Sequence, residues 1–141
     1  MQQVKLNGET VAIFHKTNEW KEGLDFLTPN ETFIQAGTWW YPKGKDLRSH
    51  SHTINKRVVE RTQEVVVVVS GKIRVDLYDK NKRLFHQDEL AAGDMGIILN
   101  VGHGYYILED NTRVIETKNG PFISVEKDKV FLNPVAATAQ K

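Results

Sequence analysis

The sequence predicts an all-β fold, an antiparallel sandwich or barrel, and three observations support this prediction. Short runs rich in Val, Ile, Phe and Tyr are separated by turn signals at short intervals. The run 63–70 contains five consecutive valines, and the run 73–78 alternates apolar and polar residues. Such strands and turns are typical of sandwiches and barrels. The turn signals lie at 7–8, 42–44, 70–71, 79–82, 92–94, 102–104, 109–111 and 119–121.

Composition excludes several classes of site and partner. The chain has no cysteine, which excludes disulfides, thiolate metal sites and cysteine nucleophiles. A net charge of +1 predicts no nucleic-acid and no membrane partner. The first residues lack the pattern of a signal peptide, and no apolar run approaches the roughly 20 residues that span a bilayer. We therefore expect a soluble cytoplasmic protein.

The chain of 141 residues has the size of one domain with its own core. No repeat, linker or low-complexity stretch divides it, so we expect a single domain over 1–141. The core is predicted over about 33–118, after N-terminal strands and one short helix in 1–32. The small and polar residues of 136–141 are expected to fray.

The N-terminal helix is predicted over 18–29. Asn18 suits the N-cap, and Pro29 ends the segment. Gly23 weakens the helix because glycine is a poor helix former. The helix would pack across one end of the barrel. Its apolar positions at helical spacing are Trp20, Leu24 and Leu27.

The strand over 63–70 is apolar on both faces, because side chains of a strand alternate in direction. Burial of both faces requires another layer or a second subunit, so we expect a homodimer. The strand over 73–78 is half-buried by its alternation, and Ser70 and Gly71 are predicted to join the two strands as a tight hairpin. One face of the strand over 63–70 carries Val65, Val67 and Val69. The other face carries Glu64, Val66, Val68 and Ser70.

Two histidines precede the valine strand. If 46–52 is extended, Arg48, His50 and His52 share one face, and the two histidine Cα atoms lie roughly 6.5–7 Å apart. That spacing allows both rings to bind one metal ion, or to act as a proton-transfer pair on one substrate. The alternative is a hydrated loop whose histidines have no role. His15 and His86 have no motif around them, and we interpret them as ordinary strand residues.

The order of these residues resembles the two motifs of the cupin superfamily. In the first motif an HxH pair, here His50 and His52, is followed by a glutamate and a glycine with six residues between them, here Glu64 and Gly71. The second motif begins with a glycine and ends near a histidine, which corresponds to 93–103. The resemblance covers roughly 33–116 and implies a jelly-roll barrel, the double-stranded β-helix.

The resemblance also implies a divalent metal. Its ligands would be His50, His52, Glu64 and His103, a set that suits Fe, Mn, Ni, Zn or Cu. Metal-free pockets also occur in this fold, so the cofactor is left open.

The sequence departs from both motifs. Eleven residues, 53–63, separate His52 from Glu64 where cupins have about four, so Glu60 is an alternative to Glu64. His103 directly follows Gly102, whereas the cupin histidine comes three residues after its glycine. The insertion is either an inert hairpin or a lid over the site.

Three functions are compatible with these residues, and whether the protein is an enzyme stays open. The first is a cupin that binds a divalent metal and a small molecule. The second is a metal-free isomerase or epimerase, similar to nucleotide-sugar ketoisomerases of this fold, in which His50 and His52 move protons with help from Tyr105. The third is a non-enzymatic ligand-binding module.

The expected ligand is a small molecule, either a sugar or an anionic metabolite. Arg48, Tyr105 and Trp40 are candidate pocket residues, because Arg48 shares the histidine face and Tyr105 follows His103 closely. A core or subunit contact is the alternative for Trp40, and a solvated side chain the alternative for Arg48. The stretches GTWWYPKGK and IETKNGPF are similar to those of small single-domain cupin-like proteins, for which no reaction carries over.

Overall fold

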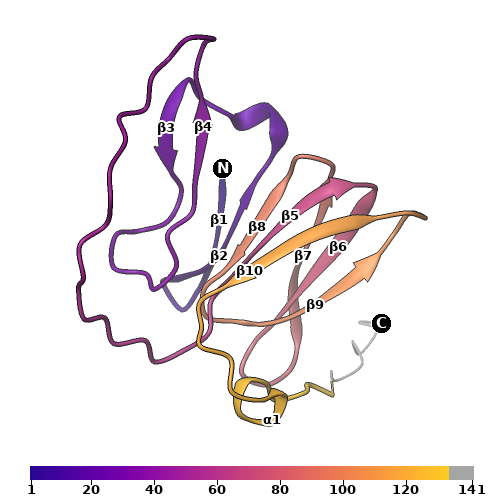
Figure 1. Ribbon diagram of the computed structural model, residues 1–141. Coiled ribbons are helices and arrows are strands. Elements are labelled where there is room, and N and C mark those ends of the chain that lie inside the picture. Colours follow the sequence, from indigo (N-terminus) through magenta and orange to yellow (C-terminus); the bar gives the residue numbers. More distant parts are fainter. Residues whose placement is uncertain (134–141) are drawn as a thin grey trace.

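The computed structural model describes residues 1–133, and within them the fold is all-β, as predicted (Figure 1). Every strand pairing is antiparallel. The predicted frayed tail, 136–141, lies outside the described residues. No helix of the described residues is long and apolar enough to cross a membrane.

The largest sheet has five strands in the order β1-β2-β8-β5-β10. Asn7 and Gly8 join its first two strands, and both have positive φ, 52° and 85°. This backbone matches the mirror-image turns that Asn-Gly favours, so the predicted turn is confirmed. The strands of this sheet are β1 (Gln2–Leu6), β2 (Glu9–His15), β8 (Met95–Ile98), β5 (Glu64–Ser70) and β10 (Arg113–Lys118).

A three-stranded sheet faces the five-stranded one and encloses the main core with it. Its order is β7 (Leu84–Ala91), β6 (Lys72–Tyr78), β9 (Gly102–Ile107). The predicted alternation in β6 is confirmed for its apolar face, which is buried. No strand pairing joins the two sheets, so among the described strands the sandwich is open and the expected closure into a barrel is not seen. The core between the sheets includes Phe14, Val66, Val68, Ile73, Val75, Leu77 and Leu90.

The hairpin predicted at Ser70 and Gly71 is wrong, because β5 and β6 belong to different sheets. Gly71 has φ of 76°, and a Cβ built on it would lie 2.2 Å from Thr112 Oγ1. The Lys72 backbone N–H donates to that same hydroxyl oxygen at 3.1 Å. The chain therefore crosses from one sheet to the other at a glycine, with no room for a side chain.

The helix predicted over 18–29 is also wrong. The chain forms a single 3-10 turn, Thr17–Glu19, and then β3 (Gly23–Phe26), which pairs with β4 (Gly37–Trp40) in a separate two-stranded sheet. Gly23 has φ of 98°, which no helical residue adopts. The one α-helical turn of the described residues is α1 (Val125–Asp128), near the opposite end of the chain.

The outer face of the five-stranded sheet, which points away from the three-stranded sheet, is only partly covered. Val65 and Ile97 form a second buried cluster with Leu27 and Ala36, which precede β4. The prediction that β5 is apolar on both faces and needs a second layer is thus confirmed at Val65, and the layer comes from the same chain. Other outward residues of this sheet remain uncovered.

Residues 41–63 connect the two-stranded sheet to β5 and contain no strand or helix. All but two of these residues, Tyr41 and Gln63, are exposed. The predicted extra length at 53–63 is therefore part of a longer connection that runs around the outside of the fold (Figure 1).

Candidate functional site

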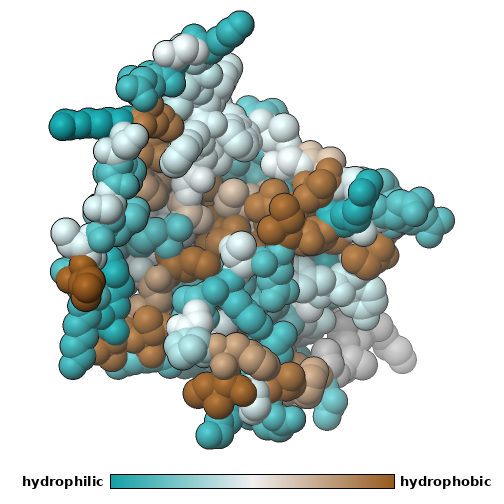
Figure 2. Space-filling model, in the orientation of Figure 1, coloured by the Kyte–Doolittle hydropathy of each residue, from teal (hydrophilic) through white to brown (hydrophobic). Residues whose placement is uncertain are grey.

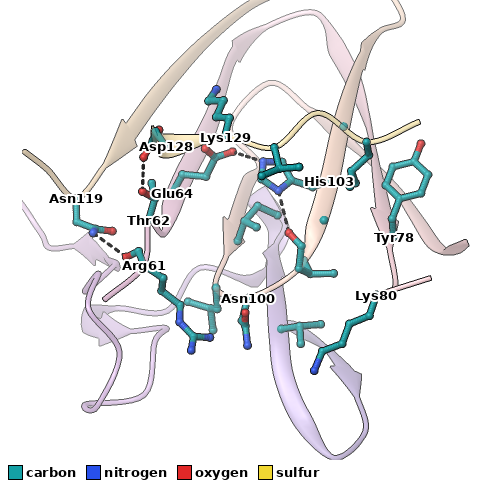
Figure 3. A pocket seen from close by; sticks show the side chains of 18 of the residues that line it. Arg61, Thr62, Glu64, Tyr78, Lys80, Asn100, His103, Asn119, Asp128 and Lys129 are labelled. Carbon is teal, nitrogen blue, oxygen red and sulfur yellow. Dashed lines mark hydrogen bonds and ion pairs between the residues drawn. The ribbon is translucent and has the colours of Figure 1, made fainter. Parts of the chain in front are cut away.

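A cavity of about 1150 Å³ lies at the end of the sandwich where β5 and β9 begin. Glu64 enters it from the five-stranded sheet, and His103 and Tyr105 enter it from the three-stranded sheet. Figure 3 shows the Glu64 carboxylate and the His103 imidazole in contact with each other in the wall of this cavity. The volume is sufficient for a sugar-sized ligand and water.

Glu64 is the central acceptor of the site. Its Oε1 accepts a hydrogen bond from the Tyr105 hydroxyl at 2.6 Å, and His103 Nε2 lies 2.9 Å from the same oxygen. Its Oε2 accepts no hydrogen bond from residues 1–133. Because Glu64 is buried and lines the cavity, Oε2 is the oxygen that remains for a ligand's donor group.

His103 donates from both ring nitrogens. Nδ1 lies 3.1 Å from the Val101 carbonyl oxygen, and Nε2 contacts the Glu64 carboxylate. A carbonyl and an ionised carboxylate can only accept, so each nitrogen carries a hydrogen. The ring is therefore an imidazolium, paired with a carboxylate at the end of the cavity.

The three groups shift one another's pKa values. Burial by itself would raise the pKa of Glu64, but the hydrogen bonds from His103 and Tyr105 outweigh it and lower that pKa to about 2. Burial would lower the pKa of His103, but the hydrogen bonds to Glu64 and Val101 raise it. Burial and the negative charge of Glu64 raise the pKa of Tyr105. At neutral pH Glu64 is thus ionised, His103 holds its second ring proton more tightly than a free imidazole does, and Tyr105 keeps its phenol proton.

The position of Glu64 is fixed through the residue that precedes it. The Gln63 backbone N–H donates to Asn119 Oδ1 at 2.7 Å, which ties the start of β5 to the end of β10. The buried Gln63 side chain accepts from the Ile34 backbone N–H at 2.9 Å and donates to the Leu99 carbonyl at 3.3 Å. Gln63 therefore joins three segments of the chain next to the carboxylate.

The C-terminal strap, residues 120–132, lines another side of the cavity. Asp128 holds it in place by accepting from the Thr62 hydroxyl at 2.6 Å and pairing with Lys118 at 3.5 Å. Lys129 follows directly and places a positive charge beside Glu64 and His103 (Figure 3). The strap thus adds a cation close to the pair of Glu64 and His103.

Sequence reasoning missed Asn119, Asp128 and Lys129. Asn119 was interpreted only as part of a turn, where asparagine often bonds its own neighbours. Its side chain instead forms two hydrogen bonds to residues distant in sequence. Oδ1 accepts from the Gln63 backbone N–H, and Nδ2 donates to the Arg61 carbonyl oxygen at 3.0 Å (Figure 3). No local pattern signals a contact across more than fifty residues, so only the fold reveals it.

The structure brings three of the predicted site residues together. Glu64, His103 and Tyr105 share the cavity, as the order of the motifs led us to expect for the first two. Glu60, the alternative to Glu64, also lines the cavity, but its side chain is exposed. The buried, hydrogen-bonded carboxylate is that of Glu64.

The other predicted residues lie elsewhere. Arg48, His50 and His52 are exposed in the connection 41–63 and do not line the cavity. The two histidine rings lie 5.1 Å apart between centroids. Trp40 is exposed at the end of β4 and is also outside the cavity lining.

The four residues predicted to bind a metal do not fit one in this arrangement. Within residues 1–133 no three His, Cys, Asp or Glu side chains are grouped so that they could hold an ion. His50 and His52 are away from Glu64, and both nitrogens of His103 are donors without a free lone pair. Metal binding by these four residues would require a different arrangement of the chain.

The comparisons with known proteins add no identity to this site. No protein-family model, no curated protein and no solved structure matches the chain. The site is therefore described from its own residues: a large cavity in an all-β sandwich, with a buried carboxylate that has one free oxygen.

Proposed function

We propose that the protein binds a hydroxylated small molecule, such as a sugar, in this cavity, with Glu64 as its anchoring acceptor. The free Oε2 of Glu64 is the observation that carries the proposal. An ionised acceptor inside a cavity forms strong hydrogen bonds with hydroxyl or N–H donors. Tyr105 and His103 hold the other oxygen, so the carboxylate is already oriented before the ligand arrives.

The charge states favour binding over proton transfer. With a pKa of about 2, Glu64 is a weak base at neutral pH. His103 already carries both ring protons, and the raised pKa of Tyr105 keeps its phenol protonated. The cavity's own residues therefore support a ligand-binding module, while acid–base catalysis by His50 and His52 with Tyr105 stays a prediction.

The cupin interpretation and its metal site also remain proposals. What supports them is the order of the two motifs, since Glu64 and His103 face one cavity. A metal bound by His50, His52, Glu64 and His103 would need the connection 41–63 to reach the cavity and His103 to release a hydrogen bond. Elemental analysis of tag-free protein tests this alternative, and less than a tenth of an equivalent of any transition metal contradicts it.

The binding proposal is tested with D-glucose and D-glucuronate as probes, by ligand-detected NMR at pH 7. We expect both sugars to bind through hydroxyl groups that donate to the Glu64 carboxylate, because both sugars carry such groups. Glu64→Gln should weaken glucose binding about tenfold, since a hydrogen bond to a charged group is worth about 1.5–3 kcal/mol.

Two matched variants serve as controls. Glu60→Gln removes an exposed carboxylate from the same cavity and should leave glucose binding unchanged. Tyr105→Phe removes one hydrogen bond to Oε1 but leaves Oε2 free, so glucose binding should remain within threefold. Equal binding by wild type and Glu64→Gln, or no signal from either sugar, would overturn the proposal.

A further inference from the structure

The outer face of the five-stranded sheet has an uncovered apolar area on β5 and β10. Ile115 of β10 lies opposite Val67 of β5, so both point to this face together with Val69. Val67 is half-buried, whereas Val69 and Ile115 are exposed. The residues that cover Val65 and Ile97 thus leave the part of the face around Ile115 open.

The two-stranded sheet adds a second apolar surface. Leu24 pairs with Trp39, and Phe26 pairs with Gly37, so Leu24, Phe26 and Trp39 share one face. All three side chains are exposed. A two-stranded sheet is at best marginally stable alone, so its exposed apolar face is a candidate for packing against another chain.

The two sheets that carry these surfaces lie next to each other. In Figure 1 the two-stranded sheet stands beside the five-stranded sheet, on the side away from the three-stranded sheet. Figure 2 shows hydrophobic atoms gathered over β10 on this visible face. We call these five residues the outer patch: Leu24, Phe26, Val69, Ile115 and Trp39.

The size of the outer patch fits a homodimer. Its side chains are between 49% and 63% exposed, and the two aromatic ones alone present roughly 180–300 Å² if a fully exposed aromatic side chain presents 150–250 Å². Each partner of a stable complex buries about 800 Å², of which about 65% is apolar in homodimers. That fraction is about 520 Å², and the two aromatic side chains alone supply roughly a third to a half of it before the three aliphatic ones are added.

We propose that the outer patch is the contact surface between two copies of this chain, related by a two-fold axis. An apolar surface is complementary to itself, which a two-fold interface requires. The chain's net charge of +1 produces little repulsion between copies, whereas an acidic or nucleic-acid partner would call for a basic surface.

Light scattering after size-exclusion chromatography, from 1 to 100 µM, tests the proposal. We expect the wild type to have twice the 16.1 kDa mass of one chain. Ile115→Glu should raise the dissociation constant at least a hundredfold, so that this variant runs as a single chain with an unchanged circular dichroism spectrum. Ile107→Glu is the matched control, because Ile107 is an exposed isoleucine on β9 of the other sheet, and it should keep the double mass.

A second measurement does not depend on introducing a charge. The chain has no cysteine, so Val69→Cys provides a single thiol within the outer patch. A short bis-maleimide should link two such chains, and should not link chains that carry Ile107→Cys. A wild type that stays monomeric at 100 µM, masses beyond the dimer, or an Ile115→Glu variant that still dimerises would each overturn the proposal.

Discussion

At the scale of single residues, Glu64 and His103 form a buried ion pair that Tyr105 completes. Such pairs bring less stability than their geometry implies, because both charges lose water on burial. Their value here is orientation: every group of the cluster has a fixed partner, and one carboxylate oxygen remains for a ligand. The loss of one partner would leave the other charge buried and unpaired.

The ion pair makes the stability of the protein depend on pH. The pKa of Glu64 falls from 4.5 to about 2 on folding, so its contribution is complete above pH 4.5 and is lost as the pH falls through 2. The pKa of His103 rises above 6.5, so its contribution is complete below pH 6.5 and is lost as the pH rises through the raised value. Both contributions are present between pH 4.5 and 6.5.

We therefore expect Glu64→Gln to lower the free energy of unfolding by about 3 kcal/mol at pH 5.5, and by far less near pH 2. Urea unfolding of both proteins across this range measures the difference. Glu60→Gln, an exposed carboxylate, should show no such dependence. A difference between wild type and Glu64→Gln that stays constant from pH 2 to 6 would contradict the assigned ion pair.

At the scale of elements, the crossing between β5 and β6 requires glycine. Gly71→Ala should destabilise the protein by about 2–5 kcal/mol, because it combines positive φ with a clash against the backbone and side chain of Thr112. Gly44→Ala is the control: Gly44 has φ of 90° but no atom within 4 Å of its Cβ position, so we expect a loss of about 1 kcal/mol. Thermal and urea unfolding measure both, and equal losses would show that the crossing is not tightly packed.

The connection 41–63 is the element least protected from proteases, because it has no strand pairing and is almost wholly exposed. Limited trypsin digestion followed by mass spectrometry should find its first cuts there. A first cut at the strand residues Lys5 or Lys72 would contradict the observed connection. The expected cut sites are Lys43, Lys45, Arg48, Lys56, Arg57 and Arg61.

The elements also show what a sequence can predict and what it cannot. The alternation in β6 predicted its buried face correctly, because a period of two leaves little ambiguity. The stretch 18–29 was misassigned because Leu24 and Leu27 fit helical spacing, whereas pairing with β4 decides the structure. Pairing partners distant in sequence leave no local pattern, and the same holds for the contact of Asn119 with Gln63 at the site.

At the scale of the whole molecule, two of the predicted metal ligands share the cavity and two do not. The motif order located Glu64 and His103, which lie on rigid strands that hydrophobic pattern predicts well. His50 and His52 lie in a connection that has no periodic pattern, so the sequence defined their spacing but not their position. Residues on strands were thus easier to place than residues between them.

The strand order β1-β2-β8-β5-β10 has a kinetic consequence. The pairs β1–β2 and β6–β7 are local hairpins and can form early. The other partner of β2 is β8, and the partners of β5 are β8 and β10, and these strands come later in the chain. Pairings between distant strands are slow to form, typically on a scale of milliseconds to seconds. At a synthesis rate of about 5–20 residues per second, the valines of β5 leave the ribosome seconds before their partners exist. During that interval the most apolar strand of the chain is the one that most needs a chaperone.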